Sequence, residues 1–189
     1  MTPNEIYDTR QEQILQAALS LIADQGADSV SMNSVANLTG LSRPAIYQYF
    51  SSREHVLAEV VINEIADLSN AIDEKLAQHS SPLEQIRVWI HYSLAHLASP
   101  EHRAIAEISM QSLPAESQRM IKAMHGHLLT ALLSPIVEIG IKDAPATAHL
   151  IFASVSASAK RIKDGGDFAK EAAALEKFTI AGISGALRE

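Results

Sequence analysis

The sequence contains no cysteine, and only 5% of its 189 residues are aromatic. The absence of thiols excludes disulfide bonds and thiolate metal sites, and it favours a reducing compartment. The longest nearly apolar stretch, residues 128–137, is interrupted by Thr130, Ser134 and Pro135 and is far shorter than the ~20 residues that a membrane helix needs. The polar N-terminus carries both signs of charge, unlike a secretory signal. We therefore expect a soluble, cytoplasmic protein with no membrane partner.

Motifs of common enzymatic chemistry are also missing from the sequence. There is no glycine-rich phosphate loop, no nucleophile elbow and no Glu-x-x-His pair. His91 and His96 are five residues apart and His125 and His127 are two apart, whereas two metal ligands on one helix face need a spacing of three or four. We therefore expect no metal, no cofactor and no enzymatic activity.

What the sequence does contain is a series of helix signals. Capping boxes at Thr9 and Ser51 and Ser-Pro pairs at Ser81 and Ser99 predict four helix starts. Apolar residues recur at helical spacing, and no segment alternates with a period of two for long enough to form a strand. The pattern predicts an all-α protein of about nine helices. We expect a three-helix headpiece over residues 1–55 and a helical body over residues 56–189.

The densest pattern lies in residues 31–57. Val35, Ala36 and Leu38 give a first short helix an apolar side, and Gly40 supplies a turn residue that can take a positive φ. Ser42 can cap a second helix of about two turns, which is held by its neighbours and free to present its outer face. This layout predicts a helix-turn-helix that reads DNA.

The same stretch resembles the tetracycline-repressor (TetR) family of bacterial transcription regulators. The resemblance is dense over residues 10–57 and only architectural beyond them. It is carried, in order and at the family's spacing, by Ser31, Val35-Ala36, Gly40-Leu41-Ser42, Ala45-Ile46-Tyr47, Tyr49-Phe50 and Ser52-Arg53-Glu54. The chain departs from the family by having Arg53 where lysine is usual and Pro44 where a small or polar residue is common. Arg53 keeps the charge, and Pro44 falls in a first helical turn, where proline is tolerated.

The resemblance implies that the second short helix enters the major groove of double-stranded operator DNA. We expect Arg43 and Gln48 to reach base edges, with Pro44 and Ala45 on the same segment. The predicted contacts to the DNA backbone come from Ser31, Ser42, Tyr47, Tyr49 and Arg53. The charge argues in the other direction, because the chain carries −7 and residues 1–55 hold three arginines against six carboxylates, or −3. We therefore expect a reader with few ionic contacts.

The last two predicted helices, residues 144–163 and 168–187, are dense in Ala, Ser and Gly and each carry an apolar stripe. The stripes alone fit an internal core as well as a subunit interface. The family resemblance implies a two-fold homodimer built as a four-helix bundle. The predicted interface residues are Val155, Ala159, Ile162, Leu175, Phe178, Thr179, Gly182, Ile183 and Ala186.

Two middle helices carry aromatic, methionine and histidine side chains on single faces. Together these side chains could line a small-molecule pocket, although each one alone fits an ordinary core better. One carboxylate could complement a cationic ligand, although a solvated position suits its pattern better. The predicted ligand-binding residues are Trp89, Tyr92, His96, Glu107, Met120, Met124 and His127.

The sequence thus predicts a dimeric, sequence-specific transcriptional regulator. The resemblance implies that the protein is a repressor, which an unknown small-molecule effector releases from a palindromic operator. The alternative is an all-helical small-molecule binder or enzyme whose headpiece does not read DNA, which the acidic charge favours.

Overall fold

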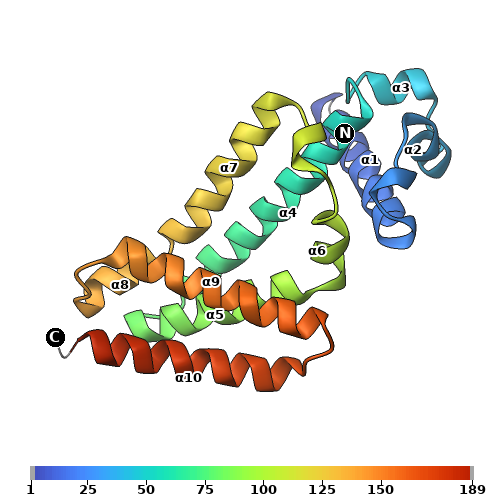
Figure 1. Ribbon diagram of the computed structural model, residues 1–189. Helices are drawn as coiled ribbons and strands as arrows, with labels where there is room; N and C mark the ends of the chain where they lie inside the picture. The colour runs from blue at the N-terminus through green and yellow to red at the C-terminus, as the bar shows by residue number, and fades with distance from the viewer. Residues whose placement is uncertain (1–2, 188–189) are drawn as a thin grey trace. The chain divides into compact units, whose positions relative to one another are not determined.

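The computed structural model describes the backbone of residues 3–187 and the side chains of residues 7–187. These residues form ten α-helices and two short 3-10 helices, with no strand among them (Figure 1). The predicted all-α class is confirmed. The chain divides into two compact units: unit 1 comprises Met1–Glu64 and Pro100–Lys122, and unit 2 comprises Ile65–Ser99 and Ala123–Glu189.

Unit 1 is built on the apolar stripe of its first helix. Ile14, Ala18 and Ile22 are buried on this helix, and Val35 and Ile46 are buried on the two short helices that follow. Burying these aliphatic side chains is what fixes the short helices, because neither is long enough to be stable alone. The elements of unit 1 are α1 (Pro3–Gln25), η1 (Ala27–Ser29), α2 (Met32–Thr39), α3 (Arg43–Tyr47), the first part of α4 (Arg53–Leu76), α6 (Pro100–Ile105), η2 (Met110–Ser112) and the first part of α7 (Ala115–Thr130).

Two predicted helix starts in unit 1 were wrong. α1 begins at Pro3, not at Thr9, so the predicted capping box lies inside the helix; proline suits the first helical position because its missing N–H has no intrahelical partner there. The start of α4 is capped by Ser52, whose Oγ accepts a hydrogen bond from the His55 N–H at 3.2 Å. Ser51 is one residue too early, and its own N–H donates to Nδ1 of His55 at 3.3 Å.

Unit 2 has its core around α5, with α8 and α9 packed against it and α10 against α9 (Figure 1). The predicted start after Ser81 is confirmed by α5, and the predicted bounds of the penultimate helix match α9. Its elements are the rest of α4, α5 (Pro82–Ala98), the rest of α7, α8 (Leu133–Ile139), α9 (Ala144–Lys163) and α10 (Phe168–Ala186).

Pro135 breaks the helix that the sequence predicted over residues 116–139. The break between α7 and α8 falls at Ala131 and Leu132, close to where a kink was predicted. A proline ring clashes with the carbonyl four residues earlier, which here belongs to Ala131, and Pro135 itself then sits harmlessly in the first turn of α8. By length and composition alone, residues 115–139 are apolar enough to cross a bilayer. A single membrane span over these residues would contain the break between α7 and α8.

The predicted domain boundary after residue 55 falls in the first turn of α4 and stays a prediction. The boundary between the two compact units lies later, after Glu64, inside the same unbroken helix. In unit 1, Glu64 pairs with α6, because its Oε1 lies 2.6 Å from Nδ1 of His102.

Candidate nucleic-acid interface

The helix-turn-helix is formed by α2 and α3. Ser31 caps α2 in a reciprocal box, since its Oγ accepts from the Ser34 N–H at 3.0 Å and its own N–H donates to the Ser34 Oγ at 2.8 Å. Gly40 ends α2 at φ 70°, a left-handed conformation that favours glycine, as predicted. Ser42 then caps α3 by accepting from the Ala45 N–H at 3.3 Å, also as predicted. The hydroxyl oxygens of Ser31 and Ser42 therefore order the two helix starts.

The outer face of α3 carries most of the predicted reading residues. Arg43, Pro44, Tyr47 and Gln48 are exposed, while Ala45 and Tyr49 are half-buried. The opposite side of α3 is anchored in the core, where Ile46 is completely buried. The short helix is therefore fixed from behind and open in front, the arrangement that a reader of the major groove needs.

Arg43 is held against the aromatic side chain one turn later. Its Nη2 donates to the Tyr47 hydroxyl at 3.3 Å, and its guanidinium carbon lies 5.6 Å from the centre of the Tyr47 ring. A guanidinium stacked on an aromatic face loses less freedom when it forms a planar pair of hydrogen bonds. Arg43 is thus partly organised for a bidentate contact before any ligand binds.

Arg53 is directed into unit 1 and binds the connection between α1 and α2. Its Nε donates to the Val30 carbonyl at 2.7 Å, and its Nη2 donates to the Ala27 carbonyl at 2.9 Å and lies 3.4 Å from the Asp28 carboxylate. The side chain is 30% exposed. These bonds use donors that a phosphate contact would need, so the predicted phosphate role of Arg53 competes with a structural one.

Tyr7 lies against Tyr49, a contact that the sequence analysis missed. The two ring centres are 4.6 Å apart and the planes are tilted by 31°. The contact exists because α1 begins about two turns earlier than predicted, so Tyr7 is helical and meets Tyr49, which lies between α3 and α4. A signal was present, since Tyr7 precedes the buried Ile14 by seven residues and so lies on the same side of the helix.

The start of α4 has an acidic side chain that is stabilised in its charged form. Hydrogen bonding to its own backbone N–H lowers the pKa of Glu54, and Ser52 and Arg53 lower it further. A carboxylate suits the first turn of a helix, where the dipole favours negative charge. The interface region therefore keeps acidic charge close to its few arginines.

Residues 14–60 match the family model described as bacterial regulatory proteins, tetR family. Over these residues the chain is similar to the tetR family. An uncharacterised HTH-type transcriptional regulator of Mycobacterium tuberculosis (strain CDC 1551 / Oshkosh) is 35% identical over 83 residues, covering 44% of this chain. The match spans only 41% of that relative's length.

Two solved structures resemble the fold of nearly the whole chain. A putative transcriptional regulator of the TetR family from Vibrio parahaemolyticus has a TM-score of 0.69 and 26% identity, covering 94% of this chain and 96% of that one. The regulator FadR from Bacillus subtilis, solved in complex with stearoyl-CoA, has a TM-score of 0.74, with 90% and 98% covered. At 17% identity the likeness to FadR shows the fold alone.

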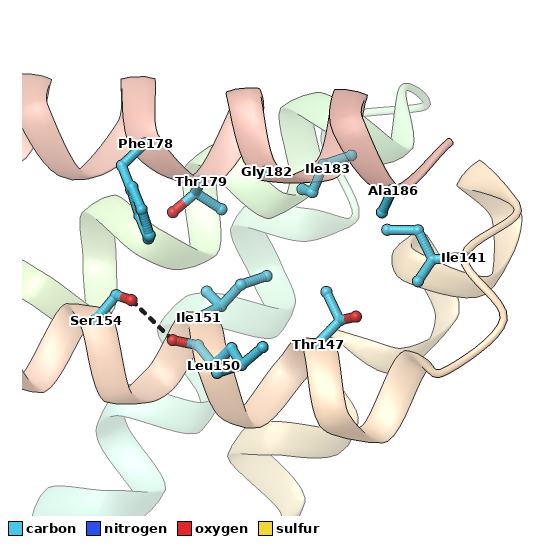
Figure 2. A pocket seen from close by; sticks show the side chains of 10 residues that line it. All are labelled: Ile141, Thr147, Leu150, Ile151, Ser154, Phe178, Thr179, Gly182, Ile183 and Ala186. Carbon is cyan, nitrogen blue, oxygen red and sulfur yellow. Dashed lines mark hydrogen bonds between the residues drawn. The ribbon is translucent and has the colours of Figure 1, made fainter. Parts of the chain in front are cut away.

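In unit 2, α9 and α10 leave an apolar groove of about 250 Å³ between them. Figure 2 shows Phe178 reaching from α10 toward α9, with Leu150 on the opposite helix. Phe178 is 68% exposed and Leu150 is 69% exposed, which is unusual for large apolar side chains. The groove is lined by Ile141, Thr147, Leu150, Ile151, Ser154, Phe178, Thr179, Gly182, Ile183 and Ala186.

The predicted dimer residues divide into two groups. Phe178, Gly182 and Ala186 are exposed along the groove, and Ile162 is half-buried. The remaining residues are buried inside unit 2 and belong to its own core: Val155, Ala159, Leu175, Thr179 and Ile183. The exposed group and Leu150 form the accessible part of this face.

The predicted ligand-binding residues are distributed over both units. Trp89 is 1% exposed, and its Nε1 donates to the Leu128 carbonyl at 2.9 Å, so it fills the core of unit 2. Tyr92, His96 and Met124 are half-buried, and the exposed His127 has its Nε2 3.7 Å from the Asp73 carboxylate. In unit 1, Glu107 and Met120 are exposed. A pocket that uses these side chains stays a prediction.

Proposed function

We propose that the chain is a dimeric, sequence-specific DNA-binding transcriptional regulator in the cytoplasm. It acts as a repressor that a small-molecule effector releases from a palindromic operator. The observation that carries the proposal is the geometry of α3, which is anchored by Ile46 and presents Arg43 and Gln48 outward. The tetR-family match over residues 14–60 supports the same reading.

In this proposal the base edges are read by Arg43 and Gln48, with Pro44 and Ala45 shaping the same surface. The DNA backbone is contacted by Ser31, Ser42, Tyr47 and Tyr49, which are neutral donors that fix the register. Arg53 contributes mainly by holding the α1–α2 connection, because its donors already bind the carbonyls of Ala27 and Val30.

Dimerisation follows from the scarcity of positive charge in the head. With three arginines in residues 1–55, a single head gains little from counterion release. Two heads fixed by a symmetric body raise the effective affinity without new contacts, and they read a palindrome with half-sites one or more helical turns apart. The exposed Leu150 and Phe178 support α9 and α10 as the faces that pair.

The effector part of the proposal rests on connectivity. α4 begins at the reading head and continues without a break into unit 2, so a change at its far end can reach Arg53. The effector would contact Tyr92, His96 and the neighbouring predicted residues. The solved complex of FadR with stearoyl-CoA supports a small-molecule effector for this fold. Binding can weaken the DNA complex only by the effector's difference in affinity between the two states, typically about 1–3 kcal/mol.

The decisive experiment is an unbiased selection of duplex DNA by the full chain, followed by a mobility shift at fixed salt. We expect one palindromic sequence to be enriched and bound far more tightly than scrambled DNA. Enrichment of no sequence, with only weak binding that vanishes above moderate salt, would contradict the proposal. In that case the alternative, a helical small-molecule binder or enzyme, would stand.

A further inference from the structure

One aromatic side chain near the start of α1 is exposed to solvent, although residues farther along the same side of the helix are buried. Tyr7 lies on the same side of α1 as the buried Ile14 and Ala18, yet it is 44% exposed. Its ring packs on Tyr49, next to the reading helix, with the ring centres 4.6 Å apart. Among the side chains that the structure describes, none forms a hydrogen bond with the hydroxyl of either tyrosine.

The charge of the head makes neutral donors necessary at this place. Residues 1–55 contain three arginines. Arg53 already donates hydrogen bonds to the carbonyls of Ala27 and Val30, and Arg43 is held on the ring of Tyr47. Tyrosine hydroxyls are regular donors to DNA phosphates. A pair of tyrosine hydroxyls beside α3 can therefore supply DNA-backbone contacts that the few arginines of the head do not provide.

We propose that Tyr7 donates a hydrogen bond to a DNA backbone phosphate, beside the phosphate that Tyr49 contacts, so that the start of α1 belongs to the DNA interface. The inference rests on the proposed function, because it takes Tyr49 to lie at the DNA backbone. The adjacent Asp8 does not block the contact, since successive side chains on an α-helix are about 100° apart. The ring contact with Tyr49 fixes where the Tyr7 hydroxyl points, and so sets the register of α1 on the duplex.

The test compares Tyr7→Phe with the parent chain in operator titrations over a range of salt concentrations. Removing only the hydroxyl keeps the ring contact, so the melting temperature should not change. We expect affinity to fall on the order of tenfold per head, equally for operator and unrelated duplex. The salt dependence should keep its slope, because no charge is removed. Ser134→Ala, which removes a hydroxyl from an exposed position in unit 2, should bind like the parent.

Two further variants separate a phosphate contact from a mere packing contact. If Tyr7 only packs on Tyr49, Tyr7→Phe will bind like the parent and only Tyr7→Ala will lose affinity, together with melting temperature; that result would overturn the inference. If the hydroxyls bind neighbouring phosphates independently, the fold-losses of Tyr7→Phe and Tyr49→Phe should multiply in the double variant. A parent chain that binds no duplex would contradict the proposed function itself, which is a different outcome from a parent-like Tyr7→Phe.

Discussion

The reading head and the α9–α10 pair are both all-helical, yet different interactions hold them. In the head, side chains bind backbone groups: Ser31 and Ser42 cap the two short helices, and Arg53 ties the α1–α2 connection. In the pair, apolar residues such as Val155 and Leu175 are buried, and Arg161 of α9 pairs with Glu171 of α10. The head therefore depends on directional bonds to backbone groups in addition to its apolar core, whereas the inner face of the pair is buried apolar area.

This difference determines which substitutions each region should tolerate. A cap or a guanidinium cannot be replaced by a similar side chain without losing its geometry, because hydrogen bonds depend on distance and angle. An apolar stripe tolerates exchange among aliphatic residues of similar volume. The two regions can therefore be disrupted by different kinds of substitution.

The largest effect is expected from Gly182→Leu on α10. A Cβ at Gly182 would meet nothing within 4 Å inside the chain, so the fold itself has room for a side chain. If the exposed groove pairs with a second copy, both leucines enter one interface, at a cost of about 4 kcal/mol for the two copies, or roughly a thousandfold in dimer dissociation. Analytical ultracentrifugation measures this, and operator affinity should fall with it.

The matched control for Gly182→Leu is Ala169→Leu, which adds leucine to an exposed position on the other side of α10. It should remain dimeric and bind DNA like the parent. A Gly182→Leu chain that stays a tight dimer with an unchanged melting temperature would show that copies pair through another surface.

A smaller effect is expected from Arg53→Ala in the head. The Ala27 and Val30 carbonyls lose their charged donor, which should lower the free energy of unfolding by about 1–3 kcal/mol. DNA affinity should fall for all sequences, because α2 and α3 lose their support. The salt dependence should keep its slope, whereas loss of a phosphate contact would reduce the slope by about one unit.

Arg53→Lys distinguishes the two roles of this residue more sharply. Lysine keeps the charge for a phosphate but lacks the planar fork that binds two carbonyls. We expect Arg53→Lys to melt like Arg53→Ala. A lysine variant with parent stability, together with a flattened slope in the alanine variant, would assign Arg53 to the phosphate role that the family resemblance implies.

Arg43→Ala should affect sequence preference more than stability. Loss of a bidentate base contact costs about 1–3 kcal/mol at one operator position and leaves nonspecific binding nearly intact. Tyr47→Phe removes the hydroxyl that accepts from Arg43 and that we place at the DNA backbone, so it should give a smaller relaxation at the same position together with a uniform loss on every sequence. Competition titrations against operators changed at each base measure both, and the exposed Arg119→Ala serves as the control. Equal loss on every sequence would make Arg43 a backbone contact.

The features predicted from the sequence are those encoded locally. The positive φ of Gly40, the cap at Ser42 and the bounds of α9 follow from residues within a turn or two of each other. The Arg53 contact joins residues 23 positions apart, and the Tyr7–Tyr49 contact needs a helix start that the capping-box pattern misplaced. Periodicity also could not tell which stripe residues of α9 and α10 face inward, because both faces carry apolar side chains.

The smallest expected effect is a difference in acid sensitivity at two exposed or half-buried carboxylates, one in each region. Hydrogen bonding from Arg161 lowers the pKa of Glu171 at the α9–α10 turn, and a backbone hydrogen bond lowers the pKa of Glu54 at the start of α4. Since each folded pKa lies below the unfolded one, each group stabilises the folded chain at pH values above its ordinary, unfolded pKa. The contribution is lost as pH falls through the folded value.

Urea unfolding of Glu171→Gln and Glu54→Gln at pH 7 and at pH 3 measures these contributions. Each variant should be slightly less stable than the parent at pH 7, and the difference should shrink at pH 3, where the parent carboxylates take up protons. The exposed Glu101→Gln provides the control for a carboxylate outside both regions. Glu54→Gln should also weaken DNA binding at pH 7 if the start of α4 supports the reading head, whereas Glu171→Gln should not. A Glu171→Gln chain whose stability deficit grows toward pH 3 would reverse the sign and contradict the role of its ion pair with Arg161.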